Sequence, residues 1–209
     1  MTETIKSKAG LFFDTETTGL PIWKDPSESP AQPHIVQLAA ELVDMETREV
    51  IACMDVIIKP DGWVISEEMT AIHGITHEHA MTVGIPEKDA VALLLDMRAK
   101  SRLRVAHNRT FDDRIVRIAL KRYFDIEAAA EDSSVVQPSD AWKEGDAFCT
   151  CVSSRKLCAL PKNKSPTLQE AHRILVGTDL EGAHNAMNDT RGCKSVYFAI
   201  IDAENKSAE

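Results

Sequence analysis

The sequence lacks any apolar run long enough to span a membrane, and residues 1–10 are polar instead of forming the apolar core of a signal peptide. Aromatic residues are scarce, at 5% of the chain, but a hydrophobic fraction of 44% still suffices for a packed core. These features argue against a membrane-spanning protein and against a disordered one. We expect a cytoplasmic chain without a membrane partner, folded as one domain over residues 1–209 with its core at about residues 9–201.

The five cysteines include no CxxC pair. Cys149 and Cys151 stand closest together, with one residue between them and no matching pair of ligands downstream. This spacing argues against a zinc site. We therefore expect all five to be reduced and mostly buried thiols: Cys53, Cys149, Cys151, Cys158 and Cys193.

An excess of positive charge is missing as well, because 24 Lys and Arg face 33 Asp and Glu, for a formal net charge of −9. This balance excludes a polycation that coats nucleic acid through bulk charge. Residues 98–122 are the exception, since they hold nine basic side chains and two acidic ones. We interpret this basic strip as a candidate phosphate-facing surface, with a solvated helix face as the alternative.

The periodicity of the apolar residues predicts an α/β chain. Strands are expected at residues 9–15, 35–43, 50–58 and 103–106, and helices at 66–72, 87–98, 111–123, 167–176 and 185–201. A hairpin of strands followed by alternating helices and strands indicates a mixed sheet covered by helices on both faces. The segment Ala128–Asp146 is acidic and aperiodic, so we expect a surface insertion or lid there.

Two acids, Asp14 and Glu16, stand at the end of the first predicted strand. Alternate residues of a strand share a face, so both carboxylates can point to one place, where a divalent cation such as Mg²⁺ or Mn²⁺ would offset their repulsion. The turn formed by residues 17–19 would bring backbone N–H groups near whatever this ion binds. Because an Asp-x-Glu pair is a short motif, a surface pair of acids is the alternative interpretation.

Two further segments each place an acid near the start of a helix. Asp112 falls in the first turn after the strand at 103–106, where an acid also suits the helix dipole. Asp189 follows His184 by five residues, about 140° around a regular helix, so the two converge only if His184 lies in the preceding loop and Asn185 caps the helix. A loop histidine suits a proton acceptor, whereas an unrelated loop histidine and surface acid are the alternative.

Together, the strings FDTETTG, VAHNRTFD and GAHNAMND resemble, in this order, the DnaQ-like branch of the DEDD exonuclease superfamily. The string AIHGIT is similar to a further segment of that family, and the resemblance extends over residues 11–201. It implies a ribonuclease H-like α/β fold, a five-stranded mixed sheet with helices on both faces. The family's general base matches His184. Its four acids, which hold two divalent ions (Mg²⁺ or Mn²⁺), match Asp14, Glu16, Asp112 and Asp189.

The candidate substrate contacts surround these motifs. Glu68 and His73 match a family pair near the terminal nucleotide, while Leu20 or Trp23 could stack against terminal bases. The full set of candidates is Thr17, Gly19, Leu20, Glu68, His73 and Asn108.

Two positions depart from the family pattern. Asn185 stands where the family often has Asp, and Arg109 stands where small residues are common. Neither change removes a residue of the four-acid set. Five histidines have no motif support and are interpreted as ordinary polar residues: His34, His77, His79, His107 and His172.

The resemblance implies a 3′–5′ exonuclease that releases nucleoside monophosphates from DNA 3′ ends, single-stranded or frayed. Because the family includes the proofreading subunit of the bacterial replicative polymerase, it also suggests a role in DNA replication, although no polymerase partner can be deduced from the residues. The preference for DNA rests on the resemblance alone. Two alternatives stay open, a 3′–5′ exoribonuclease of the same superfamily and a catalytically silent nucleic-acid-binding module.

Overall fold

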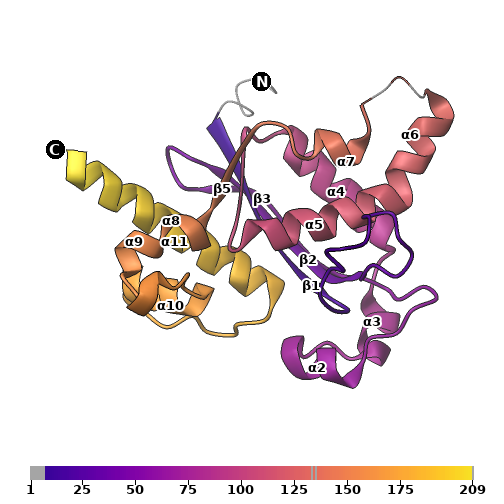
Figure 1. Ribbon diagram of the computed structural model, residues 1–209, viewed down its shortest axis with the longest axis horizontal. Coiled ribbons are helices and arrows are strands. Elements are labelled where there is room, and N and C mark those ends of the chain that lie inside the picture. Colours follow the sequence, from indigo (N-terminus) through magenta and orange to yellow (C-terminus); the bar gives the residue numbers. More distant parts are fainter. Residues whose placement is uncertain (1–7, 133, 135, 209) are drawn as a thin grey trace.

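The computed structural model describes residues 8–132, 134 and 136–208 and is built around a five-stranded sheet (Figure 1). The strands are β1 (Ala9–Thr17), β2 (Ile35–Asp44), β3 (Val50–Ile57), β4 (Leu103–Ala106) and β5 (Asp146–Cys149). Their order across the sheet is β3-β2-β1-β4-β5. The pairs β1–β2 and β2–β3 are antiparallel, whereas β1–β4 and β4–β5 are parallel. The predicted mixed five-stranded sheet is confirmed.

Helices cover both faces of this sheet (Figure 1). The helices up to residue 131 are α2 (Glu67–His73), α3 (His77–Val83), α4 (Glu87–Ala99), α5 (Arg109–Leu120), the π-helical turn η1 (Lys121–Asp125) and α6 (Ile126–Glu131). The chain after them contains α7 (Pro138–Ala141), α8 (Thr150–Ser153), α9 (Arg155–Cys158), the 3₁₀ turn η2 (Pro161–Asn163), α10 (Leu168–Leu175) and α11 (Ala186–Ala208). Helices α4 and α5 pack on one face, and α11 packs on the other.

The central strand β1 explains how the two layers are held together. Its residues alternate between the faces, so Leu11 and Phe13 join the core under α4 and α5, whereas Phe12 packs against Tyr197 and Phe198 of α11. All three β1 residues are fully buried. Because β1 is the central strand and is paired on both sides, it offers a firmly held element on which a site can be built.

Local capping sets several helix boundaries. The Ser66 and Thr76 side chains accept hydrogen bonds at the starts of α2 and α3, and Gly74 ends α2 in the left-handed conformation. Helix α10 begins with a capping box between Thr167 and Glu170. The sequence prediction included α2 and α10 but missed the short helix α3, whose Thr76 cap was its only local signal.

The segment Ala128–Asp146 was expected to be a surface insertion or lid; most of its described residues are exposed, but Ser139 and Trp142 are buried. The segment includes most of α6 and all of α7, while residues 133 and 135 lie outside the described residues. Trp142 is 1% exposed and packs edge-on against Phe13, with ring centroids 5.3 Å apart. One aperiodic stretch therefore supplies a large side chain to the core, which periodicity alone does not reveal.

The basic strip at residues 98–122 is mainly structural. Arg104 is buried and pairs with Asp113, and it also donates to the backbone carbonyls of residues 143 and 144. Arg122 pairs with the buried Glu87 and donates to two further carbonyls. Arg109, a departure from the family pattern, pairs with Asp113. These cations hold the α5 layer together, so the interpretation as a phosphate-facing surface is not supported.

All five cysteines are free, as expected, but fewer are buried than the sequence predicted. Cys158 and Cys193 are buried, Cys149 and Cys151 are partly buried, and Cys53 is exposed on the edge strand β3. Among the described residues, no helix combines the length and apolarity that crossing a membrane requires.

The burial of Trp142 generates a stability prediction. Trp142→Ala removes a fully packed indole and its hydrogen bond from Nε1 to the Asp113 carboxylate (2.9 Å), so we expect the free energy of unfolding to fall by ~3–5 kcal/mol. Trp23→Ala is the matched control, because Trp23 is 56% exposed and its loss should cost less than ~0.5 kcal/mol. Urea denaturation followed by circular dichroism measures the free energy of unfolding of both variants. Equal losses of stability would indicate that the segment around Trp142 is a peripheral insertion that does not support the core.

Candidate nuclease site

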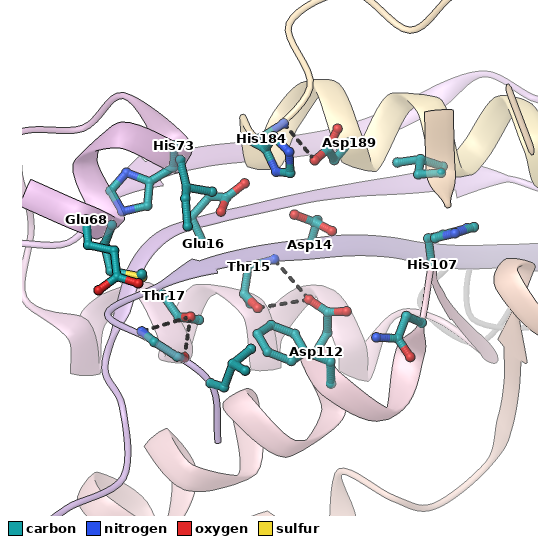
Figure 2. Close-up of a pocket in the computed structure, with 17 residues that line it drawn as sticks. Asp14, Thr15, Glu16, Thr17, Glu68, His73, His107, Asp112, His184 and Asp189 are labelled. Atoms are coloured by element: carbon teal, nitrogen blue, oxygen red, sulfur yellow. Dashed lines mark hydrogen bonds between the residues drawn. The ribbon is translucent and has the colours of Figure 1, made fainter. Parts of the chain in front are cut away.

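A cavity of about 590 Å³ opens where β1 and β4 end (Figure 2). Its walls come from β1 and the loop after it, from α2, from the start of α5 and from the loop before α11. The residues that line it are Asp14, Thr15, Glu16, Thr17, Gly19, Leu20, Glu68, Met69, Ile72, His73, His107, Asn108, Phe111, Asp112, Leu168, His184 and Asp189. The cavity therefore brings together all three motifs that the sequence singled out.

Asp14 and Glu16 project from the same face of β1, toward α11 (Figure 2). Asp189 meets them from the first turn of α11. Glu16, Asp189 and His184 each bring one potential metal-ligand atom within 4.8 Å of the other two. The convergence that the sequence could only suggest is thus present in the structure.

Asp112 reaches the cavity from the first turn of α5 and is 2% exposed. One of its oxygens, Oδ1, accepts two hydrogen bonds from Thr15, from the backbone N–H at 3.1 Å and from the hydroxyl at 2.8 Å. Sequence reasoning missed Thr15. The available signal was its place between two acids, because strand alternation turns it to the face that α5 covers.

Burial and mutual repulsion disfavour the charged forms of these carboxyls. Burial is the main cause for Asp14, followed by the charges of the other three acids, and its pKa lies well above the ordinary value. Burial and then the charge of Asp189 raise the pKa of Glu16 to about 7. Burial raises the pKa of Asp112 to about 8 despite the hydrogen bonds it accepts, and burial also raises the pKa of Asp189.

This environment fits divalent cations. The donors are hard carboxylate oxygens, and the Asp189 Oδ1 atom is buried without a hydrogen-bond partner among the described residues. No Lys or Arg belongs to the described cavity lining, so no permanently charged cationic side chain there offsets the four acids. A cation that bound at this place would relieve the repulsion and satisfy the buried oxygen.

His184 lies in the loop before α11, in the left-handed backbone conformation (φ 64°), and its side chain is exposed. Its backbone N–H donates to the Asp189 carboxylate at 3.1 Å. The Asn185 side chain accepts from the backbone of Asn188, which confirms the predicted cap. The helix start is also tied to the sheet, because the N–H of Ala186 donates to the buried Gln37 side chain on β2 at 3.1 Å.

The six candidate substrate contacts all line the cavity. Thr17 is buried and its hydroxyl donates to the Gly19 carbonyl at 2.7 Å, which fixes the turn after β1. Leu20 is 79% exposed at the rim, whereas Trp23, the other candidate for stacking, is not part of the lining. Glu68 is exposed on α2, and the Nε2 atom of His73 is buried without a hydrogen-bond partner in the described part of the chain. Asn108 adopts the left-handed conformation just before α5.

Comparison with known proteins agrees with this geometry. The family model described as Exonuclease (RNase_T) matches residues 11–197, which is most of the chain. The chain belongs to the exonuclease family. No curated protein sequence matches it.

Solved exonuclease I structures share the fold of this family member, which confirms the expected ribonuclease H-like architecture. Escherichia coli exonuclease I in complex with a dT13 oligonucleotide is 22% identical, with a TM-score of 0.68 over 93% of this chain and 40% of that one. Exonuclease I from Methylocaldum szegediense is 19% identical, with a TM-score of 0.68 over 95% of this chain and 41% of that one. The exonuclease chain described here thus spans about two fifths of the length of these relatives.

His107 supports the exonuclease site, although the sequence analysis left it as an ordinary polar residue. Its Nε2 lies 3.1 Å from the Pro166 carbonyl and its Nδ1 lies 2.9 Å from the Thr150 hydroxyl. Since a carbonyl only accepts, the proton is on Nε2 and the hydroxyl donates to Nδ1. Burial lowers the pKa of His107 to about 4, so the imidazole is neutral. It ties the end of β4 to the first residue of α8 and to the segment before α10.

The raised pKa of Glu16 predicts a pH-dependent effect of Glu16→Gln on stability in EDTA. Glu16 titrates at about 7 when folded but at an ordinary value of 4.5 when unfolded, so its contribution to wild-type stability declines as the pH rises between these values. Glutamine does not titrate. We therefore expect the variant's gain over wild type to grow from pH 4.5 to 7 and then to level off.

Urea denaturation at several pH values measures this difference, and the contributions of the histidines that lie far from Glu16 cancel in it. Saturating Mg²⁺ should reverse the order of the two proteins, because only wild type keeps the full set of acids. A difference that is constant with pH would contradict the repulsion at Glu16.

Proposed function

We propose that this chain is a metal-dependent 3′–5′ exonuclease that releases nucleoside monophosphates from the 3′ ends of single-stranded DNA. The observation that carries the proposal is the convergence of four acids and one exposed histidine in a cavity of about 590 Å³, a size typical of small-ligand sites. Hydrolysis of a phosphodiester needs a deprotonated water and a stabilised leaving oxygen, and this set of groups can meet both needs.

Asp14, Glu16, Asp112 and Asp189 would hold two divalent cations, Mg²⁺ or Mn²⁺. When bound, such ions supply positive charge to the scissile phosphate and to the oxygen that leaves. The raised pKa values of the acids and the unpartnered oxygen of Asp189 support this assignment. The occurrence of a zinc-bound form of Escherichia coli exonuclease I with single-stranded DNA is consistent with a divalent ion in a related site.

His184 would act as general base and accept the proton of the attacking water. Its exposed ring can exchange that proton with solvent, and its place beside Glu16 and Asp189 puts it at the acidic centre. The hydrogen bond from its backbone to Asp189 links the position of the base to that of an acid. Thr15 would keep Asp112 oriented in the same way.

A single strand would enter along the apolar part of the cavity. Met69, Ile72, Phe111 and Leu168 line it together with the exposed Leu20, and such side chains suit contacts with unpaired bases, whatever their sequence. Escherichia coli exonuclease I structures contain dT13 and dA16 oligonucleotides, which favours single-stranded DNA as the substrate class here. Proofreading beside a polymerase stays an expectation of the family resemblance and is not part of the proposal.

A substrate comparison tests the proposed activity. Purified protein with Mg²⁺ should shorten 5′-labelled single-stranded DNA one nucleotide at a time, and it should act more slowly on a blunt duplex than on one with a frayed 3′ end. Excess EDTA should abolish cleavage, because no described side chain in the cavity lining replaces the cations. If the protein digested an RNA strand of the same sequence faster than the DNA strand, RNA would be the preferred substrate. Undiminished digestion in EDTA would contradict the metal assignment.

The role of His184 generates a separate prediction. His184→Ala should lower the single-turnover rate by ~10²–10⁴-fold, as loss of a general base does, while the affinity for Mg²⁺ changes little. His79→Ala is the matched control, since His79 is exposed on α3 and outside the cavity lining. Calorimetric titration with Mg²⁺ distinguishes a general base from a metal ligand, the two roles that an imidazole could have at this place. A large loss of affinity in His184→Ala would make it a metal ligand instead of the base.

A further inference from the structure

The loop that carries His184 is held against α11 by side chains outside the cavity. This loop, residues 177–185, joins α10 to α11 and contains two glycines with positive φ, Gly177 and Gly182. Its first part is anchored on α10, where the buried His172 ring lies 2.8 Å from the Thr178 carbonyl through Nδ1. In the described part of the chain, the last part of this loop, which includes His184, makes no hydrogen bond to α10 and is bonded to α11 instead.

Asn188 provides the main contact between the end of the loop and α11. Its side-chain amide donates to the Gly182 carbonyl at 3.0 Å, and its backbone N–H donates to the Asn185 side chain at 3.2 Å. The fit around Gly182 is close, because a Cβ added there would lie 2.5 Å from the Asn188 amide nitrogen. A single residue thus bonds to the loop on both sides of His184.

A second contact presses the same loop onto the helix one turn further along. Leu180 packs over Gly192, where an added Cβ would come within 2.8 Å of the leucine side chain. The absence of a side chain at Gly192 therefore leaves space on the surface of α11, and the Leu180 side chain occupies it. Both contacts hold the loop against α11, and neither Asn188 nor Leu180 belongs to the cavity lining.

We propose that Asn188 is a positioning residue that sets where the His184 imidazole stands relative to Glu16 and Asp189. The inference rests on the proposed role of His184 as general base. An exposed histidine in a loop with two positive-φ glycines can sample many positions, and a base acts only within hydrogen-bond reach of the water it deprotonates. The Asn188 amide restricts the positions open to His184, because it holds the carbonyl of Gly182, which precedes His184 by two residues.

A double-mutant cycle tests this coupling. Asn188→Ala should lower the single-turnover rate at saturating DNA by ~10- to 100-fold, as a small misplacement of a catalytic group does, with KM and the Mg²⁺ affinity nearly unchanged. In the His184→Ala background the same substitution should have no further effect, because the group that it positions is gone. Asn205→Ala is the matched control, since it makes the same change at an exposed site near the end of α11. An equal loss of rate in both backgrounds would overturn the proposal.

A measurement that does not depend on catalysis separates the failure of this inference from failure of the proposed function. Hydrogen exchange at the His184 backbone amide, which is bonded to Asp189, should become faster in Asn188→Ala and in Gly182→Ala but not in Asn205→Ala. Unchanged exchange in both loop variants would overturn the positioning role. A fully active His184→Ala would instead overturn the general-base assignment and, with it, the catalytic consequence proposed for Asn188.

Discussion

Mutual repulsion among four acids at the end of β1 is the constraint on which the functional part of this structure depends. Burial and the negative charges of the other three acids raise the pKa of Asp14. Ionising all four acids together therefore costs free energy. Four groups that repel one another stay in one place only if rigid elements hold them there. Two come from the central strand, one from the start of α5 and one from the start of α11, so the acids are carried by both layers of the fold.

The distribution of positive charge follows the same logic. Most arginines of the basic strip, Arg102 excepted, make internal bonds, such as Arg104 with Asp113 and Arg122 with Glu87. No Lys or Arg side chain faces the acids in the described cavity lining. A site of this kind keeps its affinity for cations, whereas a lysine or arginine pointing into it would compete with them. The four acids of this site are among the 33 Asp and Glu that make the formal net charge of the chain negative.

Much of the architecture could be predicted from the sequence because its signals are local. The strands at β1, β2 and β4, the helix caps and the placement of His184 ahead of a helix capped by Asn185 all depend on neighbouring residues. The errors have a common origin. Trp142 lies in an aperiodic stretch but packs against Phe13 of β1, more than a hundred residues away. The basic strip was interpreted as a phosphate-facing surface because the partners of its arginines are distant in the chain.

The sequence by itself determined where the four acids and the histidine lie within their own elements, because two acids two residues apart on a strand share a face and Asn185 can cap the helix that follows His184. Only the tertiary structure decided that these groups meet. It also decided that Thr15 turns away from its neighbours to hold Asp112, and that Asn188 bonds to the loop of His184. The spacing of residues along the chain specifies which way their side chains point from one helix or strand. The distances between side chains on different elements depend on how the layers pack, and that packing depends on contacts throughout the molecule.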